Sequence, residues 1–205
     1  MTTTTPHSTI ATSQAELDAL LADLLPRQGQ WSVEGYLWLT DETNRLIEFT
    51  DGFIEVLPMP TDKHQRILKY LFLAFHAFVQ PRGVVQFAAL RVRIRADAFR
   101  EPDLLLLLDA RDPRRENRYW TGADLVLEVV SPDKPARDLV EKRGDYARAG
   151  IPEYWIVDPQ AETITVLRLD GGRYVEHGVF GRGARATSAL LAGFAVAIDA
   201  VLDAD

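Results

Sequence analysis

Two short apolar runs constrain the fold of this chain most strongly. The first is Leu104–Leu108, and the second is Leu125–Val130, which is apolar at every position except Glu128. Apolar runs of this length, without alternation, are typical of strands at the centre of a sheet that is covered on both faces. The sequence therefore predicts an α/β fold in which helices flank a central sheet.

Hydrophobic spacing and turn residues predict the other elements. Helical spacing of apolar residues predicts helices over residues 13–25, 33–39, 62–79 and 138–149. Strands are expected over residues 45–50, 53–57, 90–95, 153–158, 163–169 and 173–180. The dipeptide Asp51-Gly52 is typical of a type I′ turn, so the two strands beside it should form a hairpin. The last two strands should form a further hairpin.

Composition narrows the class of protein. The 205 residues include no cysteine, which excludes disulfides, thiolate metal sites and thiol catalysis. The length favours one domain, which we place at residues 13–205, after a disordered Thr-rich tail at residues 1–12. No apolar run approaches the length of a membrane span, and the N-terminus lacks the pattern of a signal peptide. We therefore expect a cytoplasmic protein with no membrane partner.

The charge of the chain restricts how it could bind a polyanion. The sequence has 23 Lys and Arg against 30 Asp and Glu, a formal net charge of −7. Proteins that bind nucleic acids usually carry the opposite sign, so such binding here would depend on a local site. Arg91, Arg93 and Arg95 form the best local basic face, although a solvated strand face explains them equally well.

Two acidic residues stand where an apolar strand should continue or begin. Glu128 lies inside the second apolar run, and Asp103 directly precedes the first. A bare buried carboxylate costs several kcal/mol unless it is neutralised, paired or bound to a metal. If the two strands pair antiparallel, Asp103 comes close to Glu128, whereas parallel pairing would separate them by about 16 Å. Adjacent carboxylates in a partly dry site favour a hard cation such as Mg²⁺ or Mn²⁺.

A series of motifs in fixed order resembles a known family. In chain order they are Glu48 before Asp51-Gly52, His64, Pro102-Asp103, the segment 127–132 (LEVVSP), then Asp138, Lys142 and Tyr146, and the segment 151–159 (IPEYWIVDP). The series resembles the Uma2 family of restriction-endonuclease-like proteins, which is similar to the wider PD-(D/E)XK nucleases. The resemblance covers roughly residues 30–200. It implies a restriction-endonuclease-like central mixed β-sheet flanked by helices, with additional β-hairpins.

The resemblance also implies roles for individual residues. Asp103 matches the Asp of the Pro-Asp element and would be the main metal ligand, with Glu128 as the second ligand. Glu48 would be a peripheral ligand or would hold a water. The Lys expected at position 130 is replaced by Val130. Lys142 would then supply the missing ammonium, which stabilises the transition state or positions the attacking water.

Two further residues are auxiliary candidates, and each catalytic assignment has a structural alternative. His64 could help catalysis or simply begin a helix, and Asp138 could assist the site or pair with Lys142 on a helix surface at i,i+4 spacing. Glu128 could belong to a buried structural ion pair, and Asp103 could cap a turn.

We expect a Mg²⁺- or Mn²⁺-dependent endonuclease that cleaves phosphodiester bonds, in DNA more than in RNA. The sequence does not decide the oligomeric state, and a homodimer is one alternative. Two alternatives remain at this point. The first is a non-catalytic nucleic-acid-binding or scaffold protein with the nuclease fold. The second is a sheet-based oligomer whose buried acids are structural.

Overall fold

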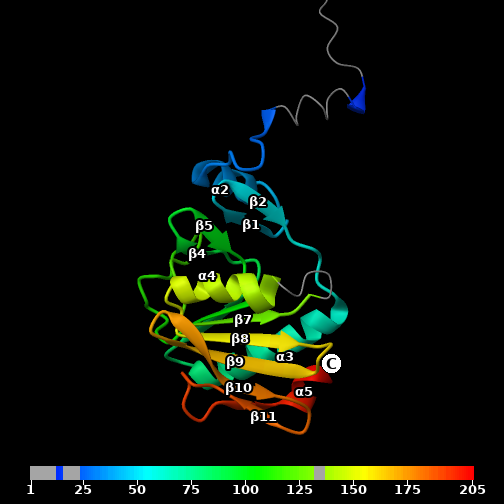
Figure 1. Ribbon diagram of the computed structural model, residues 1–205, viewed down its shortest axis with the longest axis vertical. Helices are drawn as coiled ribbons and strands as arrows, with labels where there is room; N and C mark the ends of the chain where they lie inside the picture. The colour runs from blue at the N-terminus through cyan, green and yellow to red at the C-terminus, as the bar shows by residue number, and fades with distance from the viewer. Residues whose placement is uncertain (1–12, 16–23, 132–136) are drawn as a thin grey trace, which may run out of the picture.

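A computed structural model describes residues 13–15, 24–131 and 137–205, with the side chains at 137 and 138 excluded. The predicted tail at residues 1–12 and most of the predicted helix at residues 13–25 lie outside the described residues. Three sheets and their covering helices make up the described part (Figure 1). No helix in it is long and apolar enough to cross a membrane.

The largest sheet contains both predicted apolar strands near its centre. Its six strands follow the order β10-β9-β8-β7-β6-β3. They are β3 (Val84–Phe87), β6 (Leu104–Leu107), β7 (Leu125–Val129), β8 (Glu153–Asp158), β9 (Thr163–Asp170) and β10 (Arg173–Phe180). β7 and β8 are parallel, and every other pair of neighbours is antiparallel. The predicted mixed sheet is confirmed.

The pairing of β6 with β7 positions the two acidic residues. These strands are antiparallel, and Leu104 lies opposite Leu127. One step outward along the same register, Asp103 comes beside Glu128. The antiparallel condition set by the sequence argument is therefore met.

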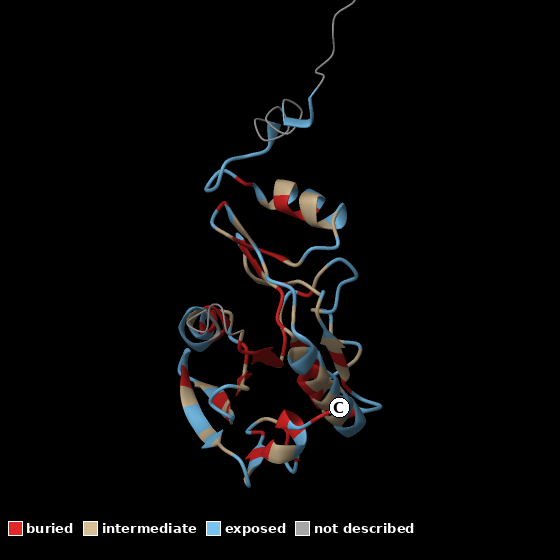
Figure 2. Cartoon of the chain, turned by 90° about the vertical axis from the view of Figure 1, so that its right-hand side faces the viewer, coloured by how far each residue is buried: buried red, intermediate tan, exposed pale blue. Residues whose placement is uncertain are grey.

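Helices cover both faces of the large sheet because its strands are apolar on both sides. One face packs against α3 (Asp62–Val79), α5 (Ile198–Leu202) and the small β11–β12 sheet (Arg185–Thr187 and Ala195–Ala197). The other face packs against α4 (Lys142–Arg148), which follows a π-helical turn, η1 (Arg137–Glu141). The helix predicted over residues 138–149 is thus split in two. Buried residues gather where these layers meet (Figure 2).

A second sheet forms a separate layer at one end of the molecule (Figure 1). Its order is β2-β1-β5-β4, with β1 (Ile47–Thr50), β2 (Phe53–Val56), β4 (Val92–Arg95) and β5 (Ala98–Arg100). Helix α2 (Val33–Asp41) packs on it through Tyr36 and Leu37. Asp51 and Gly52 have φ values of 50° and 83°, which agrees with the predicted type I′ turn.

The three arginines of the predicted basic face at residues 91–95 have local partners, and two of them pair with acids. Arg91 forms an ion pair with Asp41, and Arg95 forms one with Asp51. The Arg93 guanidinium lies over the ring of Phe99, 5.9 Å from its centroid. These arginines are therefore held in local contacts of the small sheet.

Helix α3 begins where the sequence predicts. The Thr61 hydroxyl caps it by accepting a hydrogen bond from the His64 N–H at 3.2 Å. The helix buries Leu68, Leu71 and Phe75, together with Ile67 and Val79. Phe72 is only half-buried. The cap places the His64 side chain on the first turn of the helix.

Candidate functional site

Asp103 is held in a fixed orientation at the start of β6. Its Oδ2 accepts a hydrogen bond from the backbone N–H of Val129 at 2.7 Å and lies 3.1 Å from His64 Nε2. These two contacts leave Asp103 Oδ1 without a hydrogen-bond donor among the described residues. The predicted auxiliary residue His64 therefore lies against the predicted main ligand, and one carboxylate oxygen stays available.

Glu128 is buried in β7 and faces α4. Its Oε1 accepts a hydrogen bond from the Tyr146 hydroxyl at 2.6 Å and lies 2.8 Å from Lys142 Nζ. Burial, with Glu128 and Glu48 nearby, raises the pKa of Tyr146 well above its ordinary value. The hydroxyl therefore keeps its proton and fixes the Glu128 carboxylate as a donor.

Lys142 lies beside Glu128, although the usual lysine position of the motif holds Val130. Val130 is buried, at 7% exposure, in the apolar cluster under α4. Lys142 reaches the site from the first turn of α4 and is only 2% exposed. Lys142 therefore lies in the interior and not on an exposed helix surface. Asp138 lies in η1, and its side chain is outside the described residues.

Glu48 brings a second carboxylate to Lys142. It comes from β1 of the small sheet, and its Oε1 lies 3.3 Å from Lys142 Nζ. Its Oε2 lies 3.6 Å from Arg100 Nη1, and Arg100 in turn donates to Asp145 and to Thr50. Glu48 therefore joins the small sheet to α4, directly through the Lys142 ammonium and indirectly through Arg100, which pairs with Asp145 of α4.

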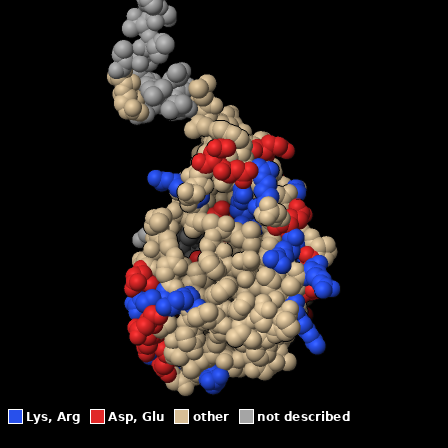
Figure 3. All heavy atoms as spheres, turned by 180° about the vertical axis from the view of Figure 1, so that it is seen from behind, with Lys and Arg blue, Asp and Glu red and all other residues tan. Residues whose placement is uncertain are grey.

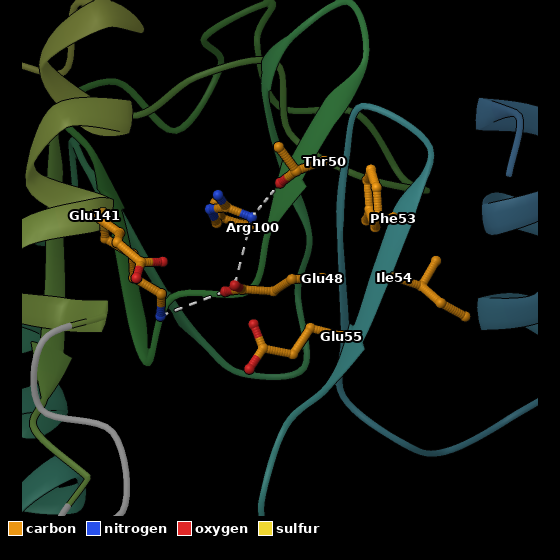
Figure 4. Close-up of a pocket in the computed structure, with 8 residues that line it drawn as sticks. Glu48, Thr50, Phe53, Ile54, Glu55, Arg100 and Glu141 are labelled. Carbon is orange, nitrogen blue, oxygen red and sulfur yellow. Dashed lines mark hydrogen bonds and ion pairs between the residues drawn. The ribbon is translucent and has the colours of Figure 1, made fainter. Parts of the chain in front are cut away.

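A pocket of about 220 Å³ opens onto these charged groups (Figure 4). Glu48, Arg100 and Lys142 line it, and so do Phe53 and Ile54 from the β1–β2 hairpin. The pocket therefore lies between the small sheet and α4, and from it a ligand can reach the lysine that contacts Glu128.

The cluster holds more acid than base. Burial and the nearby Glu48 carboxylate raise the pKa of Glu101 to about 8, although Lys142 and Arg91 oppose this. Its Oε2 is buried and has no hydrogen-bond partner among the described residues. A carboxyl with a pKa near 8 is mostly protonated at neutral pH, so Glu101 adds no full negative charge, and a cation bound beside it would favour its ionised form.

The donor set fits a hard divalent cation by chemistry, although it does not form a complete ligand shell. Within the described residues, no three His, Cys, Asp or Glu side chains are grouped so as to hold a metal ion. Mg²⁺ commonly takes one or two carboxylates and fills its other positions with waters and substrate phosphates. Asp103 and Glu128 would supply two carboxylates from adjacent strands, with Glu48 behind Lys142. Their roles as ligands stay predictions.

The chain matches the model of the Uma2 family, described as "Putative restriction endonuclease", over residues 33–199. The chain belongs to the Uma2 family. This match confirms the resemblance inferred from the motifs at Glu48, Asp103 and Glu128 and in the segment 151–159.

Among solved structures, this Uma2 chain is similar to the crystal structure of "a putative nuclease belonging to DUF820" from Anabaena variabilis. The two are 21% identical, with a TM-score of 0.65, and the match covers 82% of this chain and 97% of the other. This similarity supports the restriction-endonuclease-like fold. No curated protein matches the chain in the sequence comparison.

Sequence reasoning did not assign a role to three residues of this cluster. Tyr146 was noted only as part of the motif series, yet it donates to Glu128. Arg100 and Asp145 pair across the gap between β5 and α4, 45 positions apart in the sequence. The four-residue spacing of Lys142 and Tyr146 puts them on one side of α4 and could have indicated that both reach Glu128.

Proposed function

We propose that this Uma2 chain is a cytoplasmic endonuclease that hydrolyses phosphodiester bonds in DNA with Mg²⁺ or Mn²⁺. One observation carries the proposal: Asp103 and Glu128 lie side by side on antiparallel strands, with the Lys142 ammonium 2.8 Å from Glu128. Membership of a family described by nuclease activity supports the reaction class.

Each residue of the cluster has a distinct task in this proposal. His64 and the Val129 N–H hold Asp103 Oδ2, so that Oδ1 is free to bind a cation. The Tyr146 hydroxyl holds the Glu128 carboxylate by donating a hydrogen bond to its Oε1. Asp103 and Glu128 would hold a divalent ion, and that ion would supply a bound water of lowered pKa for in-line attack on the phosphodiester.

Lys142 contributes positive charge in a site that is otherwise acidic. Its ammonium contacts Glu128 and Glu48, and it lines the pocket from which a phosphate would approach. A preorganised cation stabilises the charge that develops on the phosphoryl oxygens, and does so more strongly in a dry site than in water. Glu48 holds this ammonium in place through their contact at 3.3 Å.

The alternative is a non-catalytic nucleic-acid-binding or scaffold protein with a nuclease fold. The buried pairing of Lys142 with two carboxylates favours this candidate, because a structural ion pair has the same geometry. In that case the acids would stabilise the junction of the two sheets and no metal would be needed.

The proposal includes a homodimer. The face of the large sheet that α3 covers has a broad area without charged side chains (Figure 3). On α3 itself, Leu73 and Phe78 are exposed, at 56% and 45%. Exposed apolar side chains that gather on one face are typical of protein interfaces. Sedimentation equilibrium of the wild type against Leu73→Glu would detect the dimer and its loss.

The deciding experiment is a cleavage assay on single- and double-stranded DNA and RNA with Mn²⁺ or with EDTA. We expect cleavage of DNA with Mn²⁺, none with EDTA and none by Asp103→Asn. Asp170→Asn is the matched control, because Asp170 is exposed at the end of β9. This variant should cleave DNA at the wild-type rate. Cleavage by Asp103→Asn at the wild-type rate, or no cleavage of any nucleic acid by the wild type, contradicts the proposal.

A further inference from the structure

An exposed lysine lies next to the carboxylate cluster and has no part in the proposed cleavage reaction. Lys63 is on the first turn of α3, directly before His64, whose Nε2 lies 3.1 Å from Asp103 Oδ2. The Lys63 ammonium donates to the Pro159 carbonyl at 3.4 Å, and it forms no ion pair with any described residue. Because an ammonium has three donor protons, one carbonyl does not use its whole capacity.

The directions of the strands place Lys63 and Asp103 at the same edge of the large sheet. β6 is antiparallel to β7, so Asp103 at the start of β6 lies beside the end of β7. β8 is parallel to β7, and Pro159 directly follows its last residue. The contact with Pro159 therefore puts the Lys63 ammonium beyond the end of β8, where α3 begins (Figure 1).

The spacing of the strands sets how long a ligand must be to reach both groups. β7 lies between β6 and β8, and two strand spacings correspond to about 10 Å. A single phosphate at Asp103 is too small to reach Lys63 as well. A ligand that contacts both must therefore be extended, as a nucleic-acid strand is.

The acidic residues around Lys63 are paired with arginines, which leaves its ammonium available. Asp62 pairs with Arg66 at 2.9 Å, and Asp203 pairs with Arg182 at 2.9 Å. Helix α3 contains no acidic residue after Asp62. Because the chain has a net charge of −7, it needs local cations of this kind to hold a polyanion.

We propose that Lys63 binds a phosphate of the substrate strand that flanks the cleaved bond. The strand would cross the carboxyl ends of β7 and β8, with the cleaved phosphodiester at Asp103. A contact of this kind positions the strand and carries no sequence information. The inference rests on the proposed nuclease function for its substrate.

The test measures binding in EDTA, so that it does not depend on cleavage. Fluorescence anisotropy follows a labelled oligo(dT) strand and a labelled strand of mixed sequence at several NaCl concentrations. Lys63→Gln should weaken binding of both strands by roughly 3- to 10-fold, because one charged contact is lost. The slope of log K against log salt should become shallower by about 0.7, the value for one phosphate of a single strand.

Two matched variants separate the charge of Lys63 from its contact with Pro159. Lys63→Arg keeps the positive charge and should bind as the wild type. Lys63→Gln keeps a hydrogen-bond donor for the Pro159 carbonyl, so a lysine with a purely structural role would tolerate it. Lys69→Gln is the control for a lost charge, because Lys69 is exposed on α3, about 9 Å further along the helix. Its salt slope should equal that of the wild type.

Several results would overturn the contact. They are an unchanged salt slope in Lys63→Gln, weakening of only one of the two strands, equal weakening in Lys63→Arg, and no binding of either strand by the wild type. Cleavage of DNA by the wild type together with an unchanged slope in Lys63→Gln would reject the contact and leave the nuclease proposal intact. Binding that depends on the charge of Lys63, without any Mn²⁺-dependent cleavage, would support the contact and reject the nuclease proposal alone.

Discussion

Two buried glutamates on neighbouring strands of the large sheet have opposite environments. Glu128 on β7 faces α4, where Lys142 and Glu48 are its charged neighbours. Glu153 on β8 is completely buried, and its partners are all neutral donors. They are the Trp155 Nε1–H and the Ser188 hydroxyl, each at 2.6 Å, and the Leu190 N–H at 2.7 Å.

The difference separates an acid that holds the fold together from one that is suited to a cation. The carboxylate oxygens of Glu153 accept hydrogen bonds from neutral donors, two of which belong to the segment after β11. These bonds hold that segment on the sheet and stabilise the charge of Glu153 without a counter-ion. Glu128 shares one ammonium with Glu48, close to Asp103 and to the buried acid Glu101. Burial alone therefore does not single out a candidate catalytic acid in this fold, and the proposed role of Glu128 depends on the ammonium it shares with Glu48 and on the neighbouring Asp103.

The largest expected effect is on cleavage. Glu128→Gln should abolish Mn²⁺-dependent cleavage, because the amide cannot replace a charged ligand. Glu153→Gln should cleave at close to the wild-type rate at a temperature at which it is folded. Initial rates on DNA, with circular dichroism to verify folding, test both variants.

Equal loss of cleavage in the two variants would remove the distinction between the two acids. Glu176→Gln is the matched control, since Glu176 is exposed on β10. It should change neither the rate nor the fold.

The second prediction concerns the charge beside Glu128. Lys142→Met removes the ammonium at similar side-chain volume and should lower kcat by about 10²- to 10³-fold, typical for loss of one transition-state stabiliser. The affinity for Mn²⁺ should not fall, because an ammonium is not a ligand. Single-turnover rates and Mn²⁺ titration measure the two effects.

An unchanged rate in Lys142→Met would make Lys142 a structural partner of the two glutamates. The control is Lys69→Met, because Lys69 is exposed on α3 and should behave as the wild type.

The third prediction concerns stability. Glu153→Gln should lower the free energy of unfolding by about 2–4 kcal/mol. The amide N–H₂ of the new Gln would face hydrogen-bond donors, so at least one donor would be buried without an acceptor. In EDTA, Glu128→Gln should cost less than about 1 kcal/mol, since Lys142 keeps Glu48 as its partner and one repulsion is removed. Urea unfolding monitored by tryptophan fluorescence gives both values. A larger loss of unfolding free energy in Glu128→Gln than in Glu153→Gln would contradict this assignment, because Glu128 would then be the acid that stabilises the fold.

The sequence predicted the centre of the large sheet well, because the apolar runs at 104–108 and 125–130 leave few alternatives. It missed β3, β5, β11, β12 and α5, which have three to five residues each. Segments this short have no readable period, so tertiary contacts decide their structure.

The part of the candidate site that could be predicted from the sequence is the part that depends on a single strand pairing. Asp103 and Glu128 come together through the pairing of β6 with β7 alone. The contacts of Glu48 with Lys142 and of Arg100 with Asp145 join different layers of the fold. Nothing in local sequence encodes them, and only the family motif linked Glu48 and Lys142 to the site. The neutral partners of Glu153 were likewise not predictable, since Ser188 is 35 positions away.

Thermal unfolding with EDTA and with Mn²⁺ tests the central claim, that Asp103 and Glu128 form a cation site, most directly. The wild type and Glu153→Gln should each gain about 2.7 kcal/mol at Mn²⁺ a hundred times its Kd. Asp103→Asn and Glu128→Gln should lose most of this gain and unfold in EDTA at close to the wild-type temperature. The account is contradicted if Mn²⁺ does not stabilise the wild type while both variants lose about 3–5 kcal/mol in EDTA, as buried structural ion pairs would.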